Sequence, residues 1–305
     1  MSVEPSTRPH REARAAALDM TLPAFLRHTP AQNHILAALP PDILEHRLSD
    51  LKLVPLPLGW VIHGAGQSQN FLYFPTEGIV SRIYETATGD SAAFAFTGKE
   101  GVIGVASFLG GESTPSRAVV ISPGFALRLE ARLLQSEFEH DSPLPRLLLR
   151  YTLALIAQTG QSVVCNRRHS VEQQLCCLIL SCLDRLPTDE LTMTQELIAS
   201  LLGVRRETVT EVAGKLQQAG MILYRRGHIA VRDRRQLEAR ACECYGVVRS
   251  KLDRLLLPED TTGHPGAHRP APRYRPTMVQ SSRTRTQPRS TCSTARVPAQ
   301  RSDGR

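Results

Sequence analysis

Residues 205–215 combine basic, acidic and hydroxyl side chains on one face of a predicted helix. The members of this face are Arg205, Arg206, Glu207, Thr208, Thr210, Glu211 and Lys215. An Arg can donate two hydrogen bonds to guanine, a Glu can accept one from cytosine N4, and a Thr can contact a thymine methyl group or a phosphate. These residue types are therefore suited to reading base edges and holding phosphates.

The elements that must position this face lie within residues 194–233, which predict a helix, a tight turn, a second helix and a short hairpin. Ala199, Gly203 and Val209 have the spacing at which two short helices meet at a steep angle. Thr194 is a good N-cap for the first helix, whose free backbone N–H groups would then face a phosphate.

A hairpin after the second helix predicts a basic wing. Residues 221–224 are extended, residues 225–228 form the turn, and residues 229–231 return. The basic residues of the tip are Arg225, Arg226 and His228, where a DNA backbone would lie. The alternative for the two helices alone is a small helical domain with a solvated charged face, and the wing favours the winged helix-turn-helix.

The bulk composition indicates a globular protein with two compact domains. The chain has 305 residues, 41% of them hydrophobic, and a net charge of +8. Residues 259–305 hold nine Arg against three acidic residues, so this segment carries most of the net charge. The most apolar stretch, residues 144–165, is interrupted by charged and polar residues, and the first thirty residues lack the apolar core of a signal peptide. We therefore expect a cytoplasmic protein that does not associate with membranes.

The cysteines do not follow a zinc-binding pattern in the sequence. The seven are Cys165, Cys176, Cys177, Cys182, Cys242, Cys244 and Cys292. Cys176, Cys177 and Cys182 lie in an apolar helical run and are expected in the core. Cys242 and Cys244 could hold a metal or form a redox pair, but neither a His nor a second cysteine pair lies near them in the sequence. The sequence thus predicts neither a metal nor a cofactor.

The remainder of the chain completes an α+β architecture. Between residues 53 and 129, short apolar runs alternate with Gly-rich turns, which indicates an antiparallel β-roll or jelly-roll-like barrel. A long helix follows from residue 144 to about residue 166. Leu148, Tyr151, Leu155, Thr159 and Ser162 form a stripe along it at coiled-coil spacing. That stripe fits either packing on its own domain or a two-fold dimer seam.

The predicted domains are a flexible leader at 1–30, a β-roll sensory domain at 31–141, a dimerisation helix at 142–167, a winged-helix DNA-binding domain at 168–257 and a disordered tail at 258–305. The tail is rich in Pro, Arg, Ser and Thr and has too few large aliphatic residues to fold.

From about residue 35 to residue 257 the chain resembles the Crp/Fnr family of bacterial transcription regulators. The motifs that carry the resemblance are NFLYFPTEGIVS (70–81), GGESTPSRAVV (110–120), CNRRHSVEQQL (165–175), GVRRETVTEVAGKLQQAGMI (203–222) and LEARACECYGVVRSKLDRLL (237–256). The resemblance implies a cyclic-nucleotide-binding-like jelly roll, a long dimerisation helix and a second head helix that enters the major groove. It also assigns base reading to Arg206, Glu207 and Thr208, whereas Glu211 replaces a base-reading Arg of the cyclic-AMP receptor protein and predicts a different operator.

The sensory region departs from family members that bind cyclic nucleotides. Arg117–Ala118 matches their phosphate-binding pair, so Arg117 is a candidate for holding an anionic effector. Gly104–Val105 stands where they have Gly-Glu, so the ribose-binding carboxylate is missing and cyclic-AMP binding of that kind is not expected. No cysteine precedes Cys165 to hold the iron–sulfur centre of the oxygen-sensing branch.

The resulting prediction is a sequence-specific regulator that binds a palindromic operator as a homodimer. Its expected partners are double-stranded DNA and a second copy of the chain, with RNA polymerase and an unidentified small-molecule effector as further candidates. The alternative is a ligand-sensing or protein-interaction module that has lost specific DNA binding. Enzyme motifs such as a phosphate loop or a nucleophile elbow do not occur, and we do not expect an enzyme.

Overall fold

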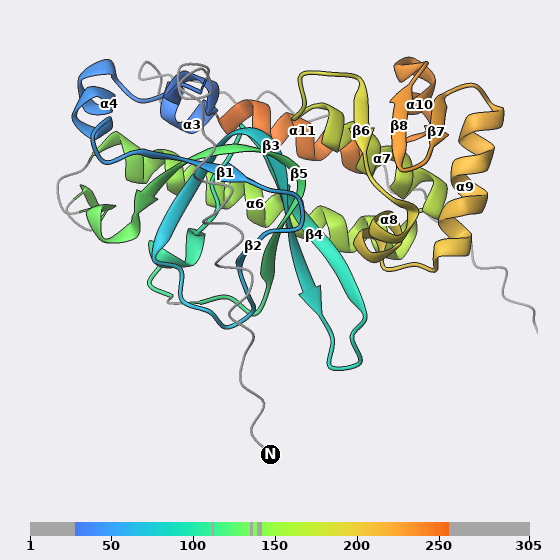
Figure 1. Ribbon diagram of the computed structural model, residues 1–305, viewed down its shortest axis with the longest axis horizontal. Helices are drawn as coiled ribbons and strands as arrows, with labels where there is room; N and C mark the ends of the chain where they lie inside the picture. Colours follow the sequence, from blue (N-terminus) through green and yellow to red (C-terminus); the bar gives the residue numbers. More distant parts are fainter. Residues whose placement is uncertain (1–27, 112, 135–136, 139–141, 256–305) are drawn as a thin grey trace, which may run out of the picture. The chain divides into compact units, whose positions relative to one another are not determined.

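The computed structural model describes residues 28–111, 113–134, 137–138 and 142–255. Most of the predicted leader and all of the predicted tail lie outside these residues. The described part folds into a β-roll, a long helix and a helical head with a small sheet (Figure 1). None of its described helices combines the length and the hydropathy needed to cross a bilayer.

The β-roll is built on one antiparallel five-stranded sheet. Its strands are β1 (Lys52–Leu56), β2 (Val61–His63), β3 (Phe71–Glu85), β4 (Ser91–Thr97) and β5 (Arg117–Glu130). They pair in the order β1-β5-β3-β4, with β2 also on β5. Leu72, Phe74 and Leu129 lie in its core with at most 2% of their surface exposed. The prediction of an antiparallel β-roll is therefore confirmed.

The strands β3 and β5 are each continuous, although the sequence shows separate short apolar runs at 71–74 and 79–84 and at 118–121 and 125–129. The register of β3 on β5 shifts between Pro75 and Val80, which is the signature of bulges. At this point a Cβ on Gly124 would lie 2.3 Å from the Glu77 carbonyl oxygen. The glycines therefore permit a close backbone approach without ending the strand. The apolar run at 102–106, which the sequence indicated as part of the roll's strands, does not form a strand: Ile103 forms only an isolated bridge to Tyr73, and η3 (Val105–Ser107) follows.

Short helices precede the roll where the sequence suggested one helical run over 33–51. They are η2 (Pro30–Gln32), α3 (His34–Ala37) and α4 (Pro41–Arg47), and η4 (Ala131–Leu134) follows β5. The side chain of Asn33 accepts hydrogen bonds from the backbone N–H groups of Ile35 and Leu36 and so caps α3. Pro40 and Pro41 separate the two helices because a proline lacks the N–H that a continuing helix needs.

The long helix is α6 (Pro143–Arg168), and it begins at the predicted Ser142–Pro143 signal. Leu148, Tyr151 and Leu155 are 0%, 2% and 8% exposed, and the Tyr151 hydroxyl lies 2.8 Å from the hydroxyl of Thr97 on β4. The stripe on which these three residues lie therefore packs on the chain's own roll, and its interpretation as a dimer seam was wrong. A dimer interface on α6 would have to use a different face of the helix.

The C-terminal part is a winged helix-turn-helix. Its elements are α7 (Val171–Leu183), β6 (Glu190–Thr192), α8 (Gln195–Leu202), α9 (Arg206–Gln218), β7 (Ile222–Arg225), β8 (His228–Val231), α10 (Arg234–Arg240) and α11 (Glu243–Leu255). The sheet has the order β6-β8-β7, and β6 was not predicted. The single helix expected over 234–257 is instead two helices, because the chain is extended at Ala241. The capping box of Ser170 and Gln173 at the start of α7 is confirmed.

Candidate nucleic-acid interface

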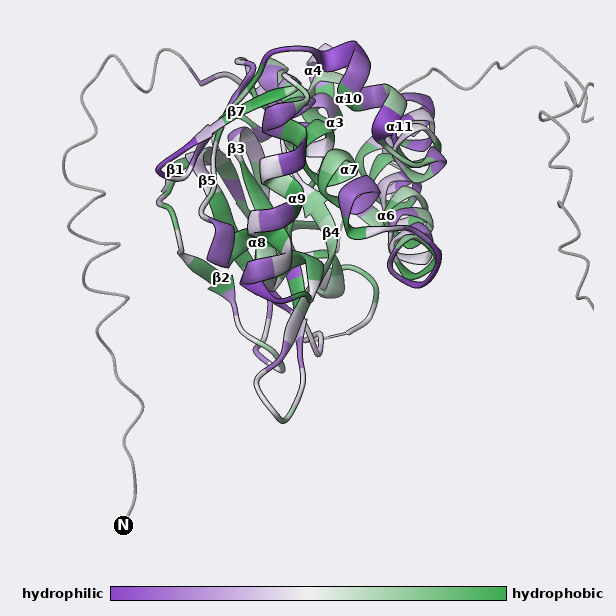
Figure 2. Cartoon of the chain, turned by 90° about the vertical axis from the view of Figure 1, so that its right-hand side faces the viewer, coloured by the Kyte–Doolittle hydropathy of each residue, from purple (hydrophilic) through white to green (hydrophobic). Residues whose placement is uncertain are grey.

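Helix α9 is held by its apolar face, which leaves the opposite face in solvent. Val209, Val212, Ala213 and Leu216 are 0–7% exposed and belong to one core with residues of α7 and α8. Burying such a face contributes roughly 1.5–3 kcal/mol for each large aliphatic side chain. Hydrophilic residues line the outward side of α9 (Figure 2). The helical period thus decides which side chains face a partner.

The predicted contact residues lie together on that outward side. Arg205, Arg206, Glu207, Thr210, Glu211 and Lys215 are exposed, and Thr208 is partly buried. The Lys215 ammonium lies 2.7 Å from a Glu211 carboxylate oxygen one helical turn away, and this hydrogen bond lowers the pKa of Glu211. Glu211 therefore stays ionised, but the positive charge of Lys215 beside it partly offsets its repulsion of phosphates.

The first head helix is positioned by a cap and a turn that the sequence predicted. The Thr194 hydroxyl accepts a hydrogen bond from the Leu197 N–H at 3.1 Å. Gly203 ends α8 with φ +66°, a left-handed conformation that strongly favours glycine. Gln195 was missed as a site residue, although it follows the N-cap directly: its side-chain oxygen accepts a hydrogen bond from the Thr210 hydroxyl at 2.8 Å.

The wing turns at Arg226 and Gly227, as predicted, and both have positive φ values of 51° and 82°. Two such residues form the turn that matches the twist of a hairpin. The Met193 N–H donates to the Gly227 carbonyl, and the Thr192 hydroxyl lies 3.2 Å from His228 Nδ1, so β6 supports the tip. The basic residues at the tip, Arg225, Arg226 and His228, are exposed.

A tyrosine connects the wing to the strand before α8. The Tyr224 hydroxyl donates to the Met193 carbonyl at 2.8 Å, and Gln217 on α9 accepts a hydrogen bond from the Tyr224 N–H at 2.7 Å. Burial raises the pKa of Tyr224 to about 12, against an opposing effect of the Arg206 charge. The phenol is thus neutral at physiological pH and fixes the wing beside Arg206.

The proposed effector residue lies apart from this surface. Arg117 begins β5, and its Nε lies 3.4 Å from a carboxylate oxygen of Glu85 on β3. Val105, at the position of the family's ribose-binding carboxylate, packs against the apolar core of the roll.

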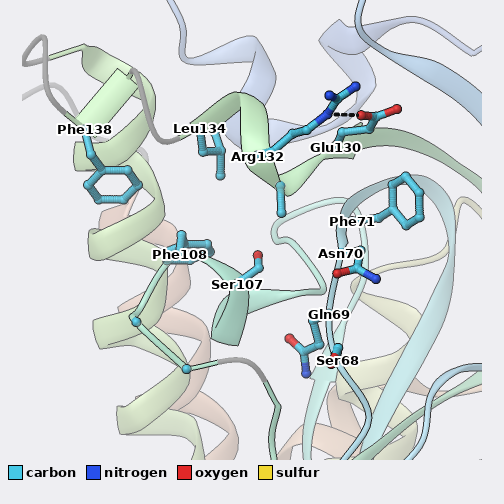
Figure 3. A pocket seen from close by; sticks show the side chains of 13 residues that line it. Ser68, Gln69, Asn70, Phe71, Ser107, Phe108, Glu130, Arg132, Leu134 and Phe138 are labelled. Atoms are coloured by element: carbon cyan, nitrogen blue, oxygen red, sulfur yellow. Dashed lines mark hydrogen bonds and ion pairs between the residues drawn. The ribbon is translucent and has the colours of Figure 1, made fainter.

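A pocket of about 960 Å³ lies on the roll side of the molecule (Figure 3). Its labelled lining includes amide side chains from Gln69 and Asn70 and rings from Phe108 and Phe138. Among the described lining residues, Glu130 and Arg132 carry the charge, and they pair with each other at 2.6 Å. Arg117 is not among the described lining residues, so the side chain proposed for an anionic effector lies outside this pocket.

The structure also brings together residues that the sequence analysis had separated. Cys165, His169, Cys242 and Cys244 place their donor atoms within 4.8 Å of one another. The sequence indicated no nearby histidine or second cysteine for Cys242 and Cys244. In the fold, however, Cys165 and His169 lie beside Cys242 and Cys244, because the end of α6 reaches the corner between α10 and α11. Cys176 and Cys182 lie in the core as predicted, with 0% exposure.

Comparison with known proteins agrees with this architecture. Residues 173–240 match the Crp-like helix-turn-helix domain. No curated protein matches the sequence. Among solved structures, FixK2 from Bradyrhizobium japonicum superposes with a TM-score of 0.56 at 18% identity, covering 63% of this chain and 98% of that one.

Two further structures share the fold. A putative transcriptional regulator of the Crp/Fnr family from Eubacterium rectale has a TM-score of 0.54 at 16% identity, covering 70% of this chain and 98% of that one. The c-di-GMP-responsive global regulator CLP of Xanthomonas campestris has a TM-score of 0.51 at 18% identity, covering 62% of this chain and 98% of that one. The chain therefore carries a Crp-like helix-turn-helix domain over residues 173–240, and its β-roll, long helix and helical head share the fold of these solved regulators.

Proposed function

We propose that the protein binds a palindromic DNA operator as a homodimer, with α9 of each copy in the major groove. The observation that carries this proposal is the outward face of α9, where Arg206 and Glu207 are exposed beside the basic wing. Side chains of these types discriminate base pairs in the major groove. The exposed, polar state of this face favours DNA binding over a module whose reading head has lost it.

The wing and the starts of both head helices supply the phosphate contacts of the proposed complex. Arg225, Arg226 and His228 are exposed at the tip. The N-cap Thr194 leaves the first backbone N–H groups of α8 free to meet a phosphate, as at other helix N-termini. These contacts set the orientation of the head without reading sequence.

A row of exposed apolar side chains on α6 supports the dimer. Leu149, Leu153, Ile156 and Val163 are 48%, 69%, 63% and 67% exposed. With Gly160 they are spaced by four and three residues alternately, which is the a/d pattern of a coiled coil. We call this row the α6 seam. It lies beside the stripe that packs on the roll, so one helix can contact its own domain and a second copy.

Selection from random DNA tests the proposal. The full chain should enrich a motif with two-fold symmetry whose half-sites lie about 10 bp apart from centre to centre, because two related heads read one face of the duplex. Repeating the selection with cell extract would show whether a small molecule alters enrichment. Recovery of a single asymmetric half-site would contradict the dimer, and recovery of unselected sequence would contradict base reading.

A further inference from the structure

Four side chains with metal-binding donors meet at the corner between the long helix and the last two helices. Cys165 lies in the last turn of α6, and His169 ends that helix four residues later on the same face. Cys242 and Cys244 flank the start of α11. Their donor atoms all lie within 4.8 Å of one another. The three cysteines are 9%, 5% and 4% exposed, so the group is shielded from water.

The individual distances are those of ligands around one small ion. Cys165 Sγ lies 3.5 Å from Cys242 Sγ, and Cys244 Sγ lies 3.4 Å from His169 Nδ1. With Zn–S bonds of about 2.3 Å and Zn–N bonds of about 2.0–2.1 Å, a tetrahedral zinc ion separates its ligands by roughly 3.5–3.8 Å. The side chains thus need only small movements to surround the ion.

The surroundings of the histidine and of one thiol match a metal site as well. His169 directs Nδ1 to the sulfurs, while its Nε2 lies 3.3 Å from a carboxylate oxygen of Glu243. A ligating histidine usually donates its other N–H to a carboxylate, which fixes the tautomer that leaves Nδ1 free to bind. Gln161 Nε2 donates to Cys244 Sγ at 3.0 Å, as a donor near a thiolate would.

We propose that Cys165, His169, Cys242 and Cys244 bind one structural zinc ion. The three thiols lose their protons to solvent on binding, and the neutral imidazole supplies the fourth ligand through Nδ1. The closed set of four protein ligands makes the site structural rather than catalytic. A cavity of about 80 Å³, lined in part by Cys165 and Cys244, lies beside the four ligands.

A single zinc ion fits better than the other occupants of such a group. An iron–sulfur cluster keeps its protein ligands farther apart, because several irons and sulfides lie between them. The spacing of 4.8 Å or less therefore selects a mononuclear site. Cys177 Sγ lies 3.3 Å and Cys165 Sγ 3.5 Å from Cys242 Sγ, so a disulfide of Cys242 with either of them is the competing chemistry.

The site would join the C-terminal end of α6 to the corner between α10 and α11. α11 already packs against α6 and α7. A bound ion would therefore fasten the last helices to the point at which the long helix leads into the head. This inference concerns metal binding and stability, and it does not depend on DNA recognition.

Metal analysis of the full-length protein tests the proposal. We expect one zinc per chain in protein purified under reducing conditions, and its release on titration of the wild-type thiols with a mercurial reagent. Co²⁺ added to the metal-free protein should give the visible bands of a tetrahedral ion and sulfur-to-metal charge transfer. Cys242→Ala should abolish this spectrum, and His169→Ala should change it.

Two further variants make the test sharp. Glu243→Gln should weaken metal affinity by about 10–100-fold, because it removes the charge that orients His169. Cys182→Ala, a buried thiol in the separate core of α7, should leave the stoichiometry unchanged. Circular dichroism of each variant identifies loss of fold.

Four outcomes would overturn the inference. The first is fully reduced, folded wild-type protein that takes up neither Zn²⁺ nor Co²⁺. The second is metal binding that persists unchanged in both Cys242→Ala and His169→Ala. The third is a mass spectrum that shows a disulfide of Cys242 with Cys165 or Cys177 in metal-free protein, which assigns the group to redox chemistry. The fourth is loss of metal binding in Cys177→Ala together with full retention of binding in His169→Ala. That result would make Cys177, and not His169, the fourth ligand.

Discussion

Arg185 Nε donates a hydrogen bond of 2.7 Å to Glu100 Oε1, although 85 residues separate them in the chain. The side chains are 5% and 10% exposed, so the pair lies almost wholly outside water. The Gly98 N–H donates to the carboxylate, and the guanidinium also donates to the Phe96 and Ser181 carbonyls. The pair therefore fastens the β-roll to α7 at the base of the head.

Removing one member of this pair should destabilise the protein strongly. Arg185→Met leaves the Glu100 carboxylate buried without its cation, and we expect a loss of about 3–5 kcal/mol in the free energy of unfolding. Urea unfolding would measure it. Arg240→Met, which breaks an exposed pair with Glu172, is the control and should cost about 0–1 kcal/mol. Equal losses in the two variants would contradict this assignment.

The α6 seam should control the oligomeric state. Ile156→Glu places a charge in the proposed apolar interface, and we expect the variant to sediment as a monomer where the wild type sediments as a dimer. Leu109→Glu introduces the same charge at a residue outside α6 that is 48% exposed, and this variant should remain dimeric. A dimeric Ile156→Glu protein would exclude the seam, and its own folding can be checked by circular dichroism.

Acid should weaken the roll through His63. Burial, aided by the charge of Arg82, lowers the pKa of His63 from 6.5 to about 4. Because the unfolded state binds the proton more readily, the neutral histidine leaves stability intact above pH 6.5, and stability falls as the pH drops from 6.5 toward 4. At pH 5 the loss from this group should be about 2 kcal/mol relative to pH 7.

The variant His63→Gln isolates this contribution. It removes the titrating group at a site where the amide of Gln69 already lies 3.3 Å from the ring. Its urea midpoint should therefore fall less than that of the wild type between pH 7 and pH 5. Parallel declines in the two proteins would show that other groups cause the acid sensitivity.

The head was predictable because its signals are local. Thr194 caps a helix, Gly203 adopts the left-handed turn, and Gly227 closes the hairpin, and each of these depends on only a few neighbouring residues. The faces of α6 were not predictable in the same way. Leu148 and Leu149 begin two adjacent apolar stripes of helical period, and only the tertiary contacts decide which one covers the roll.

The cysteine group shows the same limit more clearly. Cys165 and Cys242 are 77 residues apart, and their meeting depends on α11 folding back along α6. A search for ligands close in sequence cannot find such a site. The apolar runs within each long strand look separate in the sequence for a related reason: Gly78 and Gly124 look like turn residues, yet they serve a close crossing inside β3 and β5.

Arg206 and Arg226 should have different effects on DNA binding. Arg206→Ala removes a side chain proposed to contact bases, so it should cost about 1–3 kcal/mol on the selected operator and relax the base preference at one position. Arg226→Ala removes a proposed phosphate contact, so it should weaken binding to all sequences and lower the salt slope by about one.

Arg206→Lys provides the matched control, because it keeps the charge and loses the planar, bidentate donor. If Arg206 reads a base, the Lys variant should resemble the Ala variant in specificity while it retains affinity for unselected DNA. Titrations of operator and scrambled duplexes at several salt concentrations distinguish these effects. An equal loss on both duplexes for Arg206→Ala would mean that Arg206 contacts only the backbone, and base reading would then have to come from other exposed residues of α9.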